Sequence, residues 1–238
     1  MRKRILIWIG LAMASAFIAA SVASAADGVL TLSLSASPTK VEYPHSARLT
    51  VGFQSAEPAT VAILAMPVGA SEWTTTTLRA ATSTFTVSVK PKVTTAYKAW
   101  INDETISTPV TVQVMAKLTK PQINGYKGSP RKGHSYTVKG TMQPREDSKV
   151  TVSFWRLEST TVLVKHGIGH LKRIKRDQWI QHGDSVQVPL TNVHDNSQMS
   201  KWSTNWKPDA SGSWLIKVTH QDAAHVKSCA KTFKWVRL

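Results

Sequence analysis

Alternation of apolar and polar residues at a period of two is the feature that most limits the folds open to this chain. Between residues 29 and 115 the alternation recurs in short β-branched segments separated by turn residues, and no stretch keeps a 3.6-residue period with helix-forming residues. The segments are 29–36, 47–54, 59–66, 73–79, 83–90, 94–101 and 109–115. Seven strands within about ninety residues is the spacing of an antiparallel β-sandwich.

A second set of alternating segments follows after a short linker at residues 117–121. These segments are 134–141, 148–157, 160–166, 184–190, 198–206, 213–220 and 229–238. The pattern therefore predicts an all-β chain of two antiparallel β-sandwich domains in tandem, residues 26–117 and 118–238.

An internal repeat supports this division. His45 and Ser46 begin a pattern that recurs at His134 and Ser135, an offset of 89 residues, whereas a later matching strand recurs at an offset of 129. The second domain is thus expected to hold a 40-residue insertion between about residues 160 and 205. Insertions in loops on a rigid scaffold often carry binding residues.

The first 25 residues have the pattern of a secretory signal peptide. A basic start at residues 1–4 precedes an apolar run at 5–20, and Ala23-Ser24-Ala25 is a small-residue cleavage site. The apolar run is shorter than the ~20 residues that a spanning helix needs. We expect a secreted protein, extracellular or associated with the cell surface, with no integral membrane span after cleavage.

The positive charge is concentrated in the second domain. The chain has 30 Lys and Arg against 14 Asp and Glu, a formal net charge of +16, and residues 120–238 contribute +12 of it. Such a balance indicates an anionic partner. After export we expect an anionic cell-envelope polymer or polysaccharide, with another surface protein as a further option and nucleic acid unlikely.

The densest group of cations lies inside the predicted insertion. Lys172, Arg173, Lys175 and Arg176 occupy four of five positions. On an extended segment both faces would be basic, so we expect a loop or a protruding hairpin that either contacts an anion or is simply solvated. Trp179 and Trp202 are candidates for stacking against a sugar ring or base if they are exposed, and for core packing if they are buried.

Other side chains are expected to be structural. Trp155, Trp214 and Trp235 alternate with core positions of their strands, so they are predicted to be buried. Cys229 shares the parity of Trp235, and we expect a buried free thiol.

Signatures of catalysis are sparse. The sequence has no Gly-x-Ser-x-Gly elbow, no phosphate-binding glycine loop and no His-Glu-x-x-His motif, so neither an enzyme nor a cofactor is expected. No metal site is predicted, and the weak candidates for one are His166, His170, His182 and His194. On a strand, histidines four residues apart lie ~13 Å apart, too far to share an ion unless the glycines between them form a turn.

Three segments resemble a known family. Residues 85–100 are similar to a closing hairpin, residues 133–144 to an opening strand, and Gly212-Ser213-Trp214 with 220–225 to the end of the tandem bacterial immunoglobulin-like (fibronectin type III-like) β-sandwich domains of exported actinobacterial proteins. The resemblance implies two immunoglobulin-like domains and a non-catalytic role, although residues 165–187 depart from the family pattern. A structural spacer or adhesion module of the cell surface and, less favoured, a metal-dependent enzyme using the histidine-rich insertion are the alternatives.

Overall fold

Every regular element of the described structure is a β-strand. The computed structural model describes residues 31–101, 105–124, 129–165, 171–192 and 198–237, and it contains strands β1 to β17. The all-β class is therefore confirmed. No helix in these ranges is long and apolar enough to cross a membrane, and the predicted signal peptide lies outside them.

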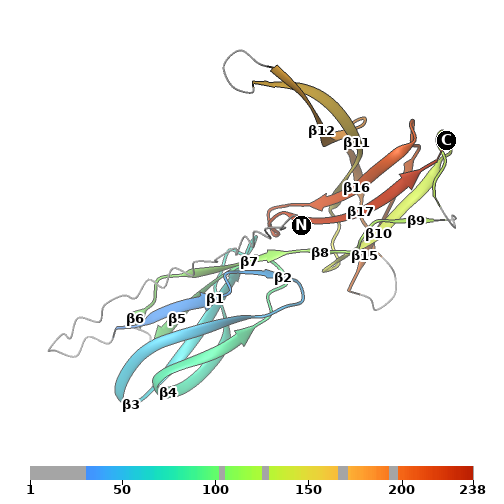
Figure 1. Cartoon of the computed structure of the whole chain (residues 1–238). Helices are drawn as coiled ribbons and strands as arrows, with labels where there is room; N and C mark the ends of the chain where they lie inside the picture. The colour runs from blue at the N-terminus through green and yellow to red at the C-terminus, as the bar shows by residue number, and fades with distance from the viewer. Residues whose placement is uncertain (1–30, 102–104, 125–128, 166–170, 193–197, 238) are drawn as a thin grey trace, which may run out of the picture.

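The N-terminal part forms a seven-stranded sheet (Figure 1). Its strands are β1 (Ser33–Ser37), β2 (Lys40–Glu42), β3 (Ala47–Pro67), β4 (Thr74–Val89), β5 (Thr95–Ile101), β6 (Thr105–Ile106) and β7 (Val110–Met115). The order is β1-β3-β5-β7-β2, with β4 paired to β3 and β6 to β5. The pairs are antiparallel except β2 with β7, which is parallel.

Two long strands replace four of the short strands expected from the sequence. Segments 47–54 and 59–66 are both part of β3, and segments 73–79 and 83–90 are both part of β4. The expected break between segments 47–54 and 59–66, which contains Pro58, is wrong because the β3–β4 ladder absorbs this stretch through register shifts on either side of Gln54. Proline cannot donate to a ladder, but it is tolerated at such irregularities.

The C-terminal part contains two five-stranded sheets. The first has β8 (Lys117–Leu118), β9 (Gln122–Asn124), β10 (Tyr136–Gln143), β14 (Thr191–Asn192) and β15 (Ser200–Trp206). The second has β11 (Lys149–Lys165), β12 (Leu171–Gln181), β13 (Val186–Pro189), β16 (Gly212–His220) and β17 (Ser228–Val236). Its main path runs β12-β11-β16-β17, and β13 pairs with β11.

Buried side chains form two separate hydrophobic clusters. One draws on the seven-stranded sheet and ends at Val114. The other begins at Ala116 and combines residues of both five-stranded sheets, such as Trp202 from β15 and Trp214 from β16. The change of cluster falls beside the predicted domain boundary at 117.

The connection between β16 and β17 links the two parts of the chain. The backbone amide of Thr94 donates to the carbonyl of Ala224 (2.7 Å), and that of Val226 donates to the carbonyl of Val114 (2.9 Å). Val226 also forms a parallel bridge with Met115. This connection is therefore held from both sides of the boundary.

Candidate functional site

A two-stranded arm extends from the C-terminal part (Figure 1). Strand β11 pairs with β16 only as far as Arg156, whereas its pairing with β12 continues to Lys165. Beyond Arg156 the two strands therefore lack a partner on the β16 side. The cationic segment is part of β12, so of the two expectations the protruding hairpin is correct.

The four cations lie on both faces of this arm. Lys172 and Arg176 are paired with Val164 and Thr160, while Arg173 and Lys175 are paired with Leu163 and Thr161 on the opposite face. All four side chains are exposed. None forms an ion pair with a carboxylate among the described residues, so the arm carries a concentrated positive field.

Trp179 lies at the base of the arm, on the outer face of the sheet. It is half-buried, and its ring centroid is 5.6 Å from that of Phe233 on β17. Phe233 is 64% exposed and Trp235 is 60% exposed, so the expectation that Trp235 is a core residue is wrong. Strand β17 instead turns Ala230 and Val236 inward, which places the alternate positions outside.

We call Trp155, Trp179, Phe233 and Trp235 the aromatic face. Trp155 is half-buried, contrary to the expectation of full burial, and the ammonium group of Lys217 lies 5.6 Å from its ring centroid. A pocket of about 230 Å³ is lined by three of the four aromatic residues. Exposed aromatic rings next to unpaired cations can stack on planar or sugar rings while the cations hold negative groups.

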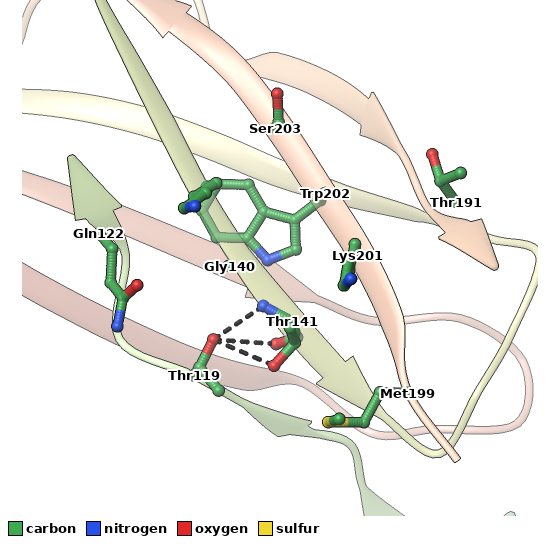
Figure 2. Close-up of a pocket in the computed structure, with 10 residues that line it drawn as sticks. Thr119, Gln122, Gly140, Thr141, Thr191, Met199, Lys201, Trp202 and Ser203 are labelled. Atoms are coloured by element: carbon green, nitrogen blue, oxygen red, sulfur yellow. Dashed lines mark hydrogen bonds between the residues drawn. The ribbon is translucent and has the colours of Figure 1, made fainter. Parts of the chain in front are cut away.

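Trp202 is not part of this surface. It is 2% exposed and belongs to the hydrophobic cluster, so of its two expected roles, stacking on a ligand and core packing, the structure places it in the core. Its indole lies against Gly140 (Figure 2), where a Cβ atom would come within 2.5 Å of Cζ2 of Trp202. The ring is buried because a glycine on the paired strand leaves room for it.

An open pocket of about 540 Å³ lies beside Trp202 (Figure 2). Its lining includes the ammonium-bearing residues Lys139 and Lys201 and the pair Thr119 and Thr141. The Thr141 amide donates to Oγ1 of Thr119 at 2.8 Å. The lining is mostly apolar, and its two threonines are hydrogen-bonded to each other.

The single cysteine, Cys229, is not buried as expected. Cys229 is a free thiol as expected, but it is exposed, so its predicted burial is wrong. It shares the outward parity of Phe233 and Trp235 on β17. The prediction that Cys229 and Trp235 lie on the same face of the strand is correct, but that face is exposed and not buried.

Of the four histidines considered as metal ligands, only His182 belongs to the described residues. His166, His170 and His194 lie outside the described ranges. His182 is half-buried, with Nε2 2.7 Å from Oε1 of Glu158 and Nδ1 3.6 Å from Asp209. Its ring packs edge-on against Trp214.

A different group of ionisable residues converges near the connection between the two parts. Glu146, His220, Asp222 and His225 place one ligand atom each within 4.8 Å of one another. Burial and the nearby charge of Asp222 raise the pKa of Glu146 to about 7. Burial also acts to raise the pKa of Asp222, but the backbone amide of His225 and the other cluster members outweigh it and hold that pKa below its usual value.

Sequence reasoning missed this group, which we call the His–carboxylate cluster. The spacing His220-x-Asp222-x-x-His225 was a usable local signal, because a turn can bring such residues together. Glu146 is far away in sequence from the other three residues, so no local spacing links it to them.

Comparisons with known proteins identify no family. No protein-family profile matches the chain, and no curated protein does. Among solved structures, an alpha-2-macroglobulin variant from Salmonella is 10% identical with a TM-score of 0.32, and it matches over 87% of this chain and 16% of its own. Red sea bream transglutaminase is 14% identical with a TM-score of 0.35, and it matches over 88% of this chain and 31% of its own. Escherichia coli alpha-2-macroglobulin is 9% identical with a TM-score of 0.31, and it matches over 87% of this chain and 17% of its own. At TM-scores this low, these likenesses carry no argument about fold or function.

Proposed function

We propose that this chain is an exported, non-catalytic binding protein of the cell surface or the medium, and that its C-terminal part holds an anionic polymer such as a cell-wall polymer or polysaccharide. The proposal includes two immunoglobulin-like β-sandwich domains in tandem, residues 26–117 and 118–238. The two separate hydrophobic clusters support that division. The signal-like N-terminus supports export.

The observation that carries the proposal is the unpaired basic arm beside the aromatic face. Lys172, Arg173, Lys175 and Arg176 project on both sides of a hairpin that contributes nothing to either hydrophobic cluster. Trp179 joins the base of this arm to Phe233. A flexible polyanion could place its charges along the arm and its rings against the aromatic face.

Binding of this kind depends steeply on salt, because each cation that neutralises a polymer charge releases a counterion. If four cations make such contacts, scaling from nucleic acids predicts that affinity falls on the order of 100-fold between about 50 and 200 mM salt. The test measures binding of the mature chain to heparin and to teichoic acid across this range. Replacing the four arm cations with Ser should weaken binding at low salt and flatten its salt dependence.

A matched control removes the same charge elsewhere. Lys40, Arg48, Lys90 and Lys117 are exposed and lie away from the arm. Replacing these four with Ser should leave the affinity within a few-fold of wild type. If both quadruple variants bind alike, only net charge matters and the arm is not the site. If the wild type shows no salt-dependent retention, the proposal fails in favour of a structural spacer.

The aromatic face is tested by a separate variant. Phe233→Ser with Trp235→Ser should lower affinity for a polysaccharide by about tenfold or more, since ring stacking contributes ~1–3 kcal/mol per contact. Stability should change little because both side chains are already mostly exposed. An unchanged affinity would restrict the binding surface to the arm.

A further inference from the structure

The His–carboxylate cluster is built from two connections of the fold and the end of one strand. Glu146 precedes β11, His220 is the last residue of β16, and Asp222 and His225 lie in the connection to β17. Both imidazole side chains are 0% exposed, whereas the carboxylate side chains are 17% exposed in Glu146 and 27% in Asp222. The two carboxylates therefore leave a path from solvent to the buried rings.

Backbone carbonyls determine which ring nitrogens carry hydrogen. Nδ1 of His220 lies 3.0 Å from the carbonyl oxygen of Lys149, and Nε2 of His225 lies 2.9 Å from that of Lys92. A carbonyl oxygen can only accept, so each of these nitrogens must donate. In neutral rings, Nε2 of His220 and Nδ1 of His225 then carry lone pairs, and both point into the cluster.

These lone pairs face other acceptors. Nε2 of His220 is 3.0 Å from Oδ2 of Asp222, and Nδ1 of His225 is 3.0 Å from Oε1 of Glu146. Lone pairs and carboxylate oxygens repel at such distances unless a proton or a metal cation lies between them. In the metal-free protein a proton carried by Glu146 or by a ring has this role, and a metal cation at the centre can replace it.

The cluster has the supporting contacts typical of a metal site. Metal-binding histidines usually donate their second ring N–H to a carbonyl or carboxylate, as both rings do here. Oδ1 of Asp222 accepts the amides of Ala224 (2.9 Å) and His225 (2.7 Å). This fixes the carboxylate and directs Oδ2 toward His220.

The cluster is close to the size of a tetrahedral zinc site. Zinc–ligand bonds of about 2.0–2.2 Å place tetrahedral ligand atoms roughly 3.3–3.6 Å apart. The four histidine–carboxylate contacts measure 3.0–3.7 Å but use both oxygens of each carboxylate. One ligand atom from each residue lies within 4.8 Å of the others, so a bound ion would draw the four closer together. Two imidazoles and two carboxylates form a donor set suited to zinc and related divalent transition metals, and one less suited to calcium or magnesium.

We propose that Glu146, His220, Asp222 and His225 form a structural site for a divalent transition metal, with zinc as the fitting ion. Four protein ligands leave no open position, as expected of a structural rather than a catalytic centre. The hydrogen-bond partners of the two rings come from different parts of the chain, Lys92 from the N-terminal part and Lys149 from the C-terminal part. A bound ion would therefore strengthen the attachment of the β16–β17 connection to both.

The test uses the full mature chain, stripped with EDTA and titrated with ZnCl₂ against a chromophoric chelator. We expect one equivalent to bind, a rise in Tm on zinc addition, and a tetrahedral absorption spectrum when cobalt(II) is the probe. Glu146→Gln and His225→Gln should each weaken zinc binding by about 100-fold or more and abolish the Tm response.

His182→Gln is the matched control, because His182 also faces two carboxylates but lies outside the cluster. It should bind zinc as the wild type does. Glu146 is partly exposed and its amide analogue has the same shape, so this variant should fold even if His225→Gln does not. Absence of stoichiometric binding, or equal binding by Glu146→Gln, would overturn the proposal and leave a cluster held together by protons alone. Neither outcome depends on polyanion binding, which is measured separately.

Discussion

Individual residues on paired strands decide which side chains can be buried. Trp202 lies in the core only because Gly140 on the neighbouring strand has no side chain. Conversely, Phe233 and Trp235 are large apolar residues that remain exposed, because their positions on β17 face away from the cluster. Residue type alone did not distinguish these cases, since all three aromatic residues sit in alternating strands.

Gly140→Ala should lower the free energy of unfolding by about 1–3 kcal/mol, because the new Cβ would overlap the buried indole of Trp202. Urea denaturation measures the change. Gly52→Ala is the control: its nearest atom is the terminal hydroxyl oxygen of Ser33, which can rotate away. Equal losses in the two variants would show that the indole is not the cause.

At the scale of strands, the length of β11 beyond its neighbour β16 creates the arm. The hairpin from Thr160 to Arg176 adds a ladder but no residue of either hydrophobic cluster. Stability in such a protein comes mainly from buried apolar area, so the arm is expected to be thermodynamically independent of the core.

Replacing residues 160–176 with a two-residue Asn-Gly turn between Ser159 and Asp177, which are paired, should therefore remove polyanion binding. We expect unfolding free energy within about 1 kcal/mol of wild type, because surface changes away from the core have small effects. Chemical denaturation and heparin retention measure the two effects. A variant that still binds, or one that no longer folds, would contradict this separation of arm and core.

At the scale of the whole molecule, the His–carboxylate cluster lies where the two parts of the chain meet, and it makes the stability of the protein depend on pH. Glu146 has a pKa of about 7 in the folded protein against an ordinary value of 4.5. Between these values the folded chain keeps a proton that the unfolded chain has released. This contribution to stability is complete below about pH 4.5 and is lost as pH rises through about 7. The lowered pKa of Asp222 acts below its ordinary value of 3.8, outside this window.

In EDTA-treated protein, the unfolding free energy of wild type relative to Glu146→Gln should therefore fall as pH rises from about 4.5 to 7. Glutamine cannot titrate, so the difference reports the titration of this carboxyl group together with its coupling to the rest of the cluster. Urea denaturation of both proteins across the range measures it. A difference that is flat or rises with pH would contradict the raised pKa.

The all-β class, the position of most strands and the location of the charge follow from the sequence, because alternation at a period of two and clustering of cations are local properties. The sequence also predicted that the cationic segment leaves the core as a loop or a protruding hairpin, since a segment that is basic on both faces cannot lie on a core. The choice of the hairpin, and of the buried face of β17, came from the way the strands pack, because parity alone is symmetric between the two faces of a strand until another sheet covers one of them. Packing also brings Glu146 to His220 and His225, because contacts between distant connections depend on how the strands are ordered in the sheets and leave no period in the sequence.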